Sequence, residues 1–311
     1  MAEGTASTAR ALHGEDAESR AQGYGALIVV QIAFGLFAIF GKWAFVDFAP
    51  EVIVGWRIVF GSAALAAVVL LRQGRRALPT LPDLGLLALL SLAGVAVNML
   101  LFLEGLERST AINAGLIMPT IPVFTFGVAV LVGHERFRWT RGLGILIALF
   151  AALALAFGRG ADLSGSTRTG NLMMVANAFS YSLYLVFSRP LVARYGPLAV
   201  TAWVFVLSLW TVPLFAADAA WIPAGASTRS WASLGYILLF PTLVAYFLNA
   251  YALARVAAST TAVFIFLQSL ITVFAAILML GEELTTRTLV CGALVFAGTA
   301  LVLFGPGRAR P

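Results

Sequence analysis

The chain has few charged residues: Asp, Glu, Lys and Arg make up 11% of its 311 residues. Soluble globular proteins carry about 25% charged residues. This deficit, together with 61% hydrophobic residues, indicates a protein that resides in a membrane. The single cysteine, Cys291, cannot form an intrachain disulfide, and two histidines supply too few ligands for a Cys/His metal site. We therefore predict no metal and no cofactor.

The sequence also lacks enzyme motifs and a signal peptide. It contains no Walker loop, and neither His13 nor His134 has a nucleophile nearby, so we predict neither catalysis nor ATP-driven transport. Residues 1–22 are polar and have no apolar core, which predicts a disordered tail. The net charge of +6 is attributed to arginines that set membrane orientation, and no nucleic-acid partner is expected.

Apolar segments recur along the rest of the chain. A helix needs about 20 mostly apolar residues to cross a bilayer. We predict ten such helices, at residues 24–46, 51–71, 84–104, 110–132, 140–158, 168–188, 197–217, 231–253, 258–280 and 286–304. The expected fold is therefore an all-α integral membrane protein, with tails at 1–22 and 306–311.

Two segments of the sequence recur at a nearly constant offset. The segment that begins at Gly133 recurs 148 residues later at Gly281, and the segment that begins at Ala49 recurs 147 residues later at Gly196. We interpret this pattern as two five-helix repeats, residues 23–158 and 168–305. Because five is odd, the second repeat would enter the membrane from the opposite side, which predicts an inverted pair around a central cavity.

The placement of arginines predicts the orientation of the chain. With the N-terminus in the cytoplasm, thirteen arginines fall on the cytoplasmic side and five on the outer side. Loops that stay in the cytoplasm carry the excess of Lys and Arg. Both termini are therefore expected in the cytoplasm.

Polar side chains recur at helical spacing inside several predicted spans. The repeat offset aligns Asn98 with Tyr246, and Thr120 with Gln268, so the polar faces of the two halves correspond. Polar groups in a bilayer face protein or a water-filled cavity. The candidate substrate-binding residues are Gln31, Phe34, Asn98, Asn113, Tyr181, Tyr184, Tyr246, Asn249 and Gln268. The alternative interpretation is hydrogen bonding between packed helices.

Two cations and three prolines within the spans have separate interpretations. Lys42 either extends to the lipid headgroups or binds a substrate carboxylate. Arg57 is interpreted as one member of an interfacial ion pair with the nearby acids of the span 1–2 connection. Proline removes a backbone hydrogen bond and kinks a helix. The candidate kink or gating positions are Pro119, Pro122 and Pro241.

Together these segments resemble the drug/metabolite transporter superfamily, EamA type. The matching pieces are Gly41-Lys42, Ala49-Pro50 leading to Trp56-Arg57, the Ser109–Pro122 and Ala258–Gln268 stretches, and the Gly133–Arg136 and Gly281–Glu283 loops. The resemblance covers about residues 24–305 and is greatest to amino-acid and metabolite exporters of bacterial inner membranes. It implies a secondary transporter with a small-molecule substrate and the lipid bilayer as partner.

The resemblance and the cavity residues lead to one functional prediction. We expect export of small metabolites, above all amino acids including aromatic ones, across the bacterial inner membrane by alternating access. Aromatic rings would pack against the apolar part of the substrate, and amides and tyrosines would bind its polar part. Three alternatives on this fold are a multidrug exporter, a nucleotide-sugar or other metabolite carrier, and a lipid-precursor flippase. The predicted cavity faces carry almost no basic charge, which argues against phosphorylated substrates.

Overall fold

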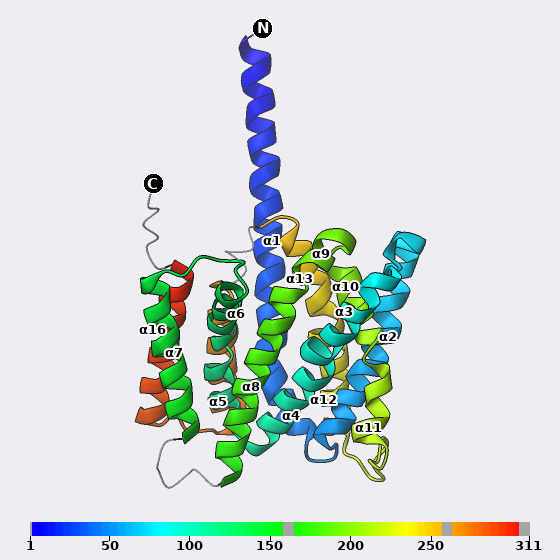
Figure 1. Cartoon of the computed structure of the whole chain (residues 1–311), viewed down its shortest axis with the longest axis vertical. Coiled ribbons are helices and arrows are strands. Elements are labelled where there is room, and N and C mark those ends of the chain that lie inside the picture. The colour runs from blue at the N-terminus through cyan, green and yellow to red at the C-terminus, as the bar shows by residue number, and fades with distance from the viewer. Residues whose placement is uncertain (1, 158–164, 257–262, 305–311) are drawn as a thin grey trace.

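The computed structural model describes residues 2–157, 165–256 and 263–304, and helices account for most of them (Figure 1). The first half contains α1 (Ala2–Ala44), α2 (Pro50–Gln73), η1 (Gly74–Ala77), α3 (Leu81–Ser91), η2 (Leu92–Ala96), α4 (Val97–Arg108), α5 (Ala111–Ile117), α6 (Thr120–Leu131) and α7 (Trp139–Phe157). The second half contains α8 (Gly165–Phe187), α9 (Arg189–Tyr195), α10 (Pro197–Val206), η3 (Leu209–Thr211), α11 (Val212–Ala216), α12 (Thr228–Leu239), η4 (Phe240–Val244), α13 (Ala245–Leu253), α15 (Ile265–Ala275), η5 (Ala276–Leu280) and α16 (Thr286–Phe304).

Eight helical segments in the described part of the chain are long and apolar enough to cross a membrane. They are Ala21–Ala44, Pro50–Ala77, Leu81–Arg108, Ala111–Leu131, Trp139–Phe157, Pro197–Ala216, Thr228–Ala252 and Thr286–Phe304. The predicted span 168–188 coincides with α8, which is long enough but carries many polar side chains. The predicted span 258–280 is described only from residue 263, and its apolar helix Ile265–Leu280 falls short of a full crossing. The described residues therefore do not confirm the predicted count of ten.

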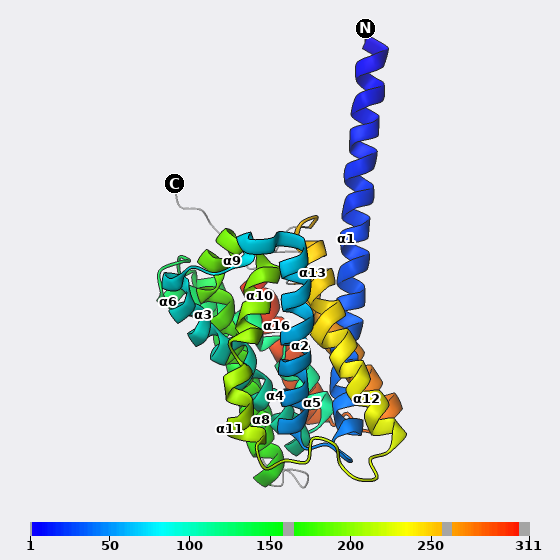
Figure 2. The same cartoon turned by 90° about the vertical axis from the view of Figure 1, so that its right-hand side faces the viewer.

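The N-terminal segment differs from the prediction of a disordered tail over residues 1–22. Residues 2–22 continue α1 as one helix that extends well beyond the bundle (Figures 1 and 2). Alanine, glutamate and arginine recur in this segment, and all three favour helix. The helical residues that follow let this propensity propagate without a new nucleation step. The predicted tail 306–311 lies outside the described residues.

The secondary structure repeats along the chain. α7 and α16 have 19 residues each and begin 147 positions apart, at Trp139 and Thr286. A π-helical turn interrupts the third span of each half, as η2 at Leu92–Ala96 and as η4 at Phe240–Val244. Such turns are rare inside α-helices and occur frequently at functional sites. Their matching positions make the duplication visible in the backbone as well as in the sequence.

The helices form one bundle whose two ends differ. We call the end at which α1 enters and α16 finishes the terminal face, and the opposite end the far face (Figure 1). α1 runs from the terminal face to the far face, whereas α8 begins at the far face and runs back (Figure 1). α7 and α16 pack together at one edge, where a Cβ on Gly144 would lie 2.6 Å from the carbonyl oxygen of Gly298. Only glycine permits so close an approach of two backbones.

The three prolines singled out in the sequence have different structural effects. Pro119 lies between α5 and α6 and separates them, so the predicted span 110–132 consists of two helices. Pro122 lies in the first turn of α6, where a missing backbone N–H leaves the helix intact. Pro241 lies within η4, where the helix widens to a π-turn. Two of the three are therefore at helix irregularities.

Candidate functional site

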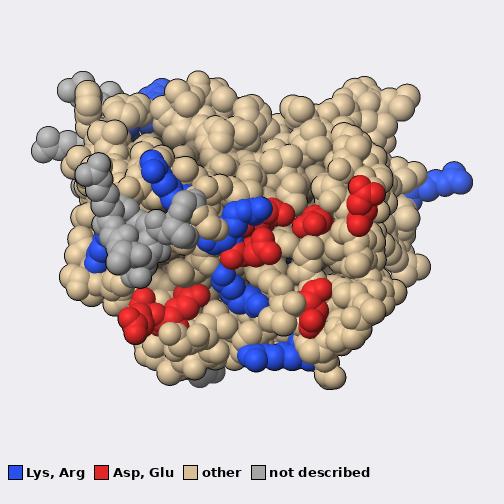
Figure 3. Space-filling model, turned by 90° about the horizontal axis from the view of Figure 1, so that it is seen from below, with Lys and Arg blue, Asp and Glu red and all other residues tan. Residues whose placement is uncertain are grey.

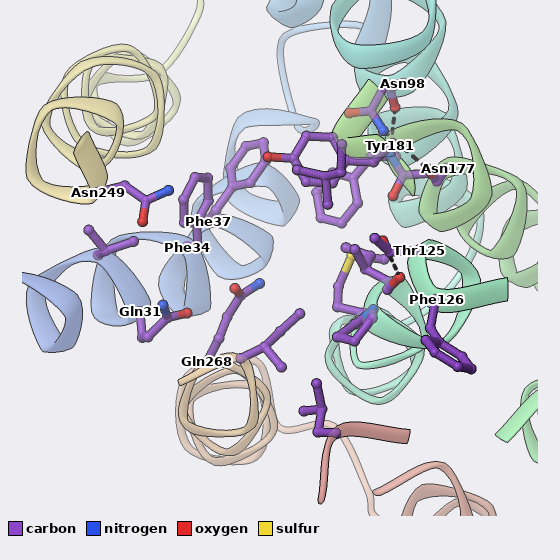
Figure 4. A pocket seen from close by; sticks show the side chains of 18 of the residues that line it. Gln31, Phe34, Phe37, Asn98, Thr125, Phe126, Asn177, Tyr181, Asn249 and Gln268 are labelled. Carbon is purple, nitrogen blue, oxygen red and sulfur yellow. Dashed lines mark hydrogen bonds between the residues drawn. The ribbon is translucent and has the colours of Figure 1, made fainter. Parts of the chain in front are cut away.

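A cavity of about 610 Å³ lies among α1, α2, α4, α6, α8, α13 and α15. Figure 4 shows its side chains converging from these helices. The candidate residues among its lining are Gln31, Phe34, Asn98, Pro122, Tyr181, Tyr246, Asn249 and Gln268. The structure thus brings most of the predicted positions together around one space, although they come from both halves of the sequence.

Asn113 and Tyr184 do not line this cavity. Asn113 is buried on α5, where its amide donates to the Ser109 hydroxyl at 3.2 Å and its backbone N–H is capped by Thr110. The ring of Tyr184 packs against Gly94, where a Cβ would meet it at 2.6 Å. Asn113 therefore bonds locally at the start of α5, and Tyr184 packs α8 against η2.

Asn98 and Asn177 connect α4 to α8 at the wall of the cavity. The Asn98 amide donates to the Asn177 carbonyl at 3.1 Å, and the Asn177 amide donates to the Asn98 carbonyl at 2.7 Å (Figure 4). Each side-chain amide thereby donates one N–H to the backbone carbonyl of the other residue and keeps its own side-chain oxygen as an acceptor. Asn177 lies within the predicted span 168–188 and lines the cavity, although it was not among the predicted lining residues.

Three other amides remain uncommitted. Among the described residues, the side chains of Gln31, Asn249 and Gln268 have no hydrogen-bond partner, and Gln31 is nevertheless buried. Gln31 on α1 and Gln268 on α15 point toward each other across the space (Figure 4). Each primary amide offers two donors and one acceptor oxygen. These groups can therefore bind a polar ligand without breaking a contact of the fold.

Aromatic rings make up the apolar walls. The rings of Phe34 and Tyr246 meet edge to face at 6.4 Å, and those of Phe37 and Phe102 stack at 5.1 Å. On the other side, Tyr181 stacks on Tyr184 at 5.6 Å. Edge-to-face and offset contacts at these distances rigidify the rings. The resulting walls suit a flat or branched apolar group.

Arg57 on α2 is a lining residue whose role the sequence interpretation missed. It is only 4% exposed, and its guanidinium lies 4.6 Å from the centre of the Phe37 ring. No described carboxylate lies within salt-bridge distance of it, so the predicted interfacial ion pair is wrong. The sequence does contain a signal for this role, because an arginine inside an apolar span by itself indicates a candidate functional site.

Pro241 explains how Arg57 is held. A proline at this position cannot donate to the carbonyl of Ile237, four residues earlier. The Thr242 hydroxyl donates to that carbonyl at 2.8 Å and accepts from Arg57 Nε at 2.9 Å. The irregularity of η4 thus supplies a hydroxyl acceptor that fixes one edge of the guanidinium.

The cavity reaches the terminal face, where its lining becomes charged. Glu135 lies 3.3 Å from Arg141 and 3.8 Å from Arg189, so one carboxylate pairs with two arginines. Arg141 Nε is buried and has no hydrogen-bond acceptor among the described residues. The Arg141 guanidinium also lies 5.0 Å from the centre of the Phe126 ring. Basic groups therefore lie both inside the cavity and at its mouth.

The far face is closed by polar contacts between segments distant in sequence. The Glu282 carboxylate accepts from the backbone N–H groups of Ala111 and Ile112 at 2.7 and 2.8 Å. Lys42 donates to the carbonyls of Glu107 and Ser109, so it caps the end of α4. In the structure this amine bonds to the protein backbone, a contact that neither sequence interpretation of Lys42 included. Figure 3 shows charged side chains of both signs gathered near the middle of this face.

A second closure at the far face involves the loop between α1 and α2. Asp47 accepts from the Ser230 hydroxyl at 2.6 Å, and from the backbone N–H and hydroxyl of Ser227 at 3.0 and 2.8 Å. These hydrogen bonds hold the pKa of Asp47 below its ordinary value of 3.8. The loop is thereby tied to the start of α12.

No group of His, Cys, Asp and Glu in the described residues could hold a metal ion.

Comparison with known proteins places two segments in one family. Residues 21–157 and 168–304 each match the profile of the EamA-like transporter family. The two matches begin 147 residues apart, which agrees with the repeat read from the sequence.

Three similar proteins and one solved structure describe the range of relatives. "Uncharacterized transporter YdfC" of Bacillus subtilis is 29% identical over 286 residues, covering 86% of this chain and 90% of that protein. "Probable terminal-alkyne amino-acid exporter" of Streptantibioticus cattleyicolor is 28% identical over 79% of this chain and 81% of that protein. "WAT1-related protein At4g30420" of Arabidopsis thaliana is 24% identical over 91% of this chain and 85% of that protein. A crystal structure with 18% identity aligns with a TM-score of 0.61 over 92% of this chain and 98% of that chain, which shows a common fold.

Proposed function

Because this chain belongs to the EamA-like transporter family, we propose that it is a secondary transporter that exports small metabolites, with amino acids, including aromatic ones, as its main substrates. The observation that carries the proposal is the cavity itself. Its aromatic walls enclose the uncommitted amides of Gln31, Asn249 and Gln268. A small molecule with one apolar and one polar end fits this arrangement. The relative named as an amino-acid exporter supports the substrate class.

The proposal includes a ten-helix architecture of two inverted repeats. α8 crosses the bundle between the two faces despite its polar residues, and α15 with η5 supplies the remaining span (Figure 1). The opposite directions of α1 and α8 support the inversion (Figure 1). In this arrangement both termini are cytoplasmic in the bacterial inner membrane, and the protein catalyses no reaction.

Alternating access is the proposed mechanism. The cavity reaches the terminal face at Glu135, whereas Glu282 and Lys42 hold the far face closed. With cytoplasmic termini, this is an inward-open state that is ready to take up substrate from the cell. Release would require the far-face contacts to separate while the helices around Glu135 close, with Pro119 and Pro241 as candidate bending points.

The residues that line the cavity bear on two of the alternatives, the multidrug exporter and the nucleotide-sugar carrier. A site for lipophilic cations needs a free carboxylate, and the one acidic residue of the described lining, Glu135, is paired with two arginines. The prediction that the cavity faces carry almost no basic charge is wrong, because Arg57 and Arg141 line the cavity. Nucleotide sugars therefore belong in the test. No observation favours a lipid-precursor flippase.

Uptake into proteoliposomes tests the proposal. The purified protein is reconstituted, and labelled amino acids, lipophilic drugs and nucleotide sugars are offered one at a time, with protein-free liposomes as control. We expect saturable uptake of one or more amino acids. Exchange of nucleotide sugars in the absence of any amino-acid uptake would overturn the assignment.

A further inference from the structure

Arg57 places a buried positive charge inside the helix bundle, and no acid among the described residues pairs with it. The side chain is 4% exposed, and the salt bridges of the described residues do not include it. Burying an unpaired ion costs several kcal/mol, and intramembrane cations accordingly pair or bind ligands. Contacts with the Phe37 ring and the Thr242 hydroxyl offset part of this cost but leave the charge uncompensated.

The hydrogen-bond pattern leaves the outer edge of the guanidinium free. Nε is committed to Thr242 Oγ1 at 2.9 Å, and in the described part of the chain Nη1 and Nη2 have no acceptor. Arg57 also lines the cavity, so these two nitrogens are the ones available to a bound molecule. Two parallel N–H donors match the two oxygens of a carboxylate.

The surroundings of Arg57 indicate what is attached to that carboxylate. Phe34 and Phe37 from α1, Tyr181 from α8 and Tyr246 from α13 line the same space. An apolar or aromatic group would pack against these rings while its carboxylate reaches the guanidinium. Gln31 and Gln268 remain for a second polar group, such as an amino group.

The charge along the route to Arg57 favours anions as well. Arg141 and Arg189 lie at the mouth of the same cavity, and a single carboxylate, Glu135, accompanies them in the described lining. A lining with three arginines and one acid attracts anions and repels cations.

From these observations we propose that Arg57 binds the carboxylate of the transported molecule, and that the substrate class is small carboxylates with an apolar or aromatic side group. The amino group of an amino acid is an accessory feature that the amides can accept, not a requirement. This inference rests on the proposed function in one respect, namely that the cavity is the transport site.

A pair of probes that differ only at the headgroup tests it without relying on transport. Binding of 3-phenylpropionate and of its neutral amide, 3-phenylpropionamide, is measured by ligand-dependent thermal stabilisation of the full chain in detergent. Wild type should bind the acid about tenfold or more tightly than the amide, as expected for charge-assisted hydrogen bonds. Arg57→Gln should lose this preference and bind both probes equally. Arg72→Gln, at the exposed end of the same helix, is the matched control and should behave as wild type.

A second variant keeps the test decisive if Arg57→Gln does not fold. Arg57→Lys retains the charge without the two parallel donors, so it should keep a weaker preference for the acid. Wild type that binds acid and amide equally, or a folded Arg57→Gln that keeps the preference, would overturn the role of Arg57.

Uptake of the same acid into proteoliposomes separates this inference from the proposed function. Carboxylate binding that depends on Arg57, without uptake of any carboxylate or amino acid, would refute the transport function and leave the binding site standing. Amino-acid uptake that is unchanged by Arg57→Gln would refute the binding role and leave the transporter standing.

Discussion

Glu282 closes the far face across the two halves, and neutralising it should open that face. Its two carboxylate oxygens accept from the first two backbone N–H groups of α5, at 2.7 and 2.8 Å. Because Thr110 already caps the next free N–H, these two donors depend on Glu282 alone. Glu282→Gln keeps one acceptor oxygen but removes the charge and the second acceptor.

The structure allows the effect to be sized. An anion at a helix N-terminus is worth about 0.3–1 kcal/mol, and loss of a capping side chain costs about 1 kcal/mol. Together they give about 1–2 kcal/mol, which corresponds to roughly a 5–30-fold change in a two-state equilibrium. We expect Glu282→Gln to raise the population of molecules open at the far face by that factor.

Thiol accessibility measures this population. The single native thiol is removed as Cys291→Ala, and Thr125→Cys places one thiol on the cavity wall. A membrane-impermeant maleimide is added to intact cells, and its labelling rate reports opening of the far face. Glu283→Gln, an exposed neighbour with the same charge change, is the control. A folded Glu282→Gln that labels at the same rate as Glu283→Gln would refute the assignment of Glu282 as a closing contact.

Three further predictions concern helix packing, the pH dependence of stability, and the separate roles of a cavity-lining amide and a structural amide. Gly298→Ala would place a Cβ 2.7 Å from the backbone of α7. Thermal unfolding in detergent should therefore show that stability falls by about 1–3 kcal/mol. The control Gly127→Ala, whose Cβ would have 3.9 Å of clearance, should be tolerated. Asp47 stabilises the fold while ionised, so the melting-temperature difference between wild type and Asp47→Ala should be full above the ordinary pKa of 3.8 and disappear as the pH falls through the lower folded pKa; a difference constant down to the acid limit would contradict this. Gln268 lines the cavity, so Gln268→Ala should reduce uptake without changing the melting temperature. Asn113 holds a hydrogen bond of the fold, so Asn113→Ala should lower the melting temperature. The reverse pattern would contradict these two assignments.

The duplication and most of the spans could be predicted from the sequence because both depend on local composition. Apolar runs of about 20 residues identify helices without reference to their neighbours. The family matches at 21–157 and 168–304 confirm the repeat. α8 shows the limit of hydropathy, because a helix that packs inside the bundle can carry polar groups and still cross it.

Which polar residues line the cavity and which bond to neighbouring parts of the fold could not be predicted, because this depends on what each helix face contacts. Asn113 and Gln268 are both amides inside predicted spans, yet one bonds to Ser109 and the other faces the cavity. The repeat offset pairs Asn113 with Thr261, which lies outside the described residues. Arg57 was assigned to nearby acids in the sequence, but the fold turns it inward to Thr242 on a helix 185 residues away. Such pairings follow from tertiary packing.

Of the three π-helical turns in the described residues, η2 and η4 stand at matching positions of the two halves, which suggests an order of events in the history of this chain. A π-turn adds one residue to a helix and rotates everything beyond it, which here includes Asn98 after η2 and Tyr246 after η4. Pro241 accompanies the second turn, whereas Ala93 stands at the matching position of the first, so proline is not the shared cause. An inserted residue carried by a single ancestral half accounts for both. On that account the π-helical turn was already present in the ancestral half before it was duplicated.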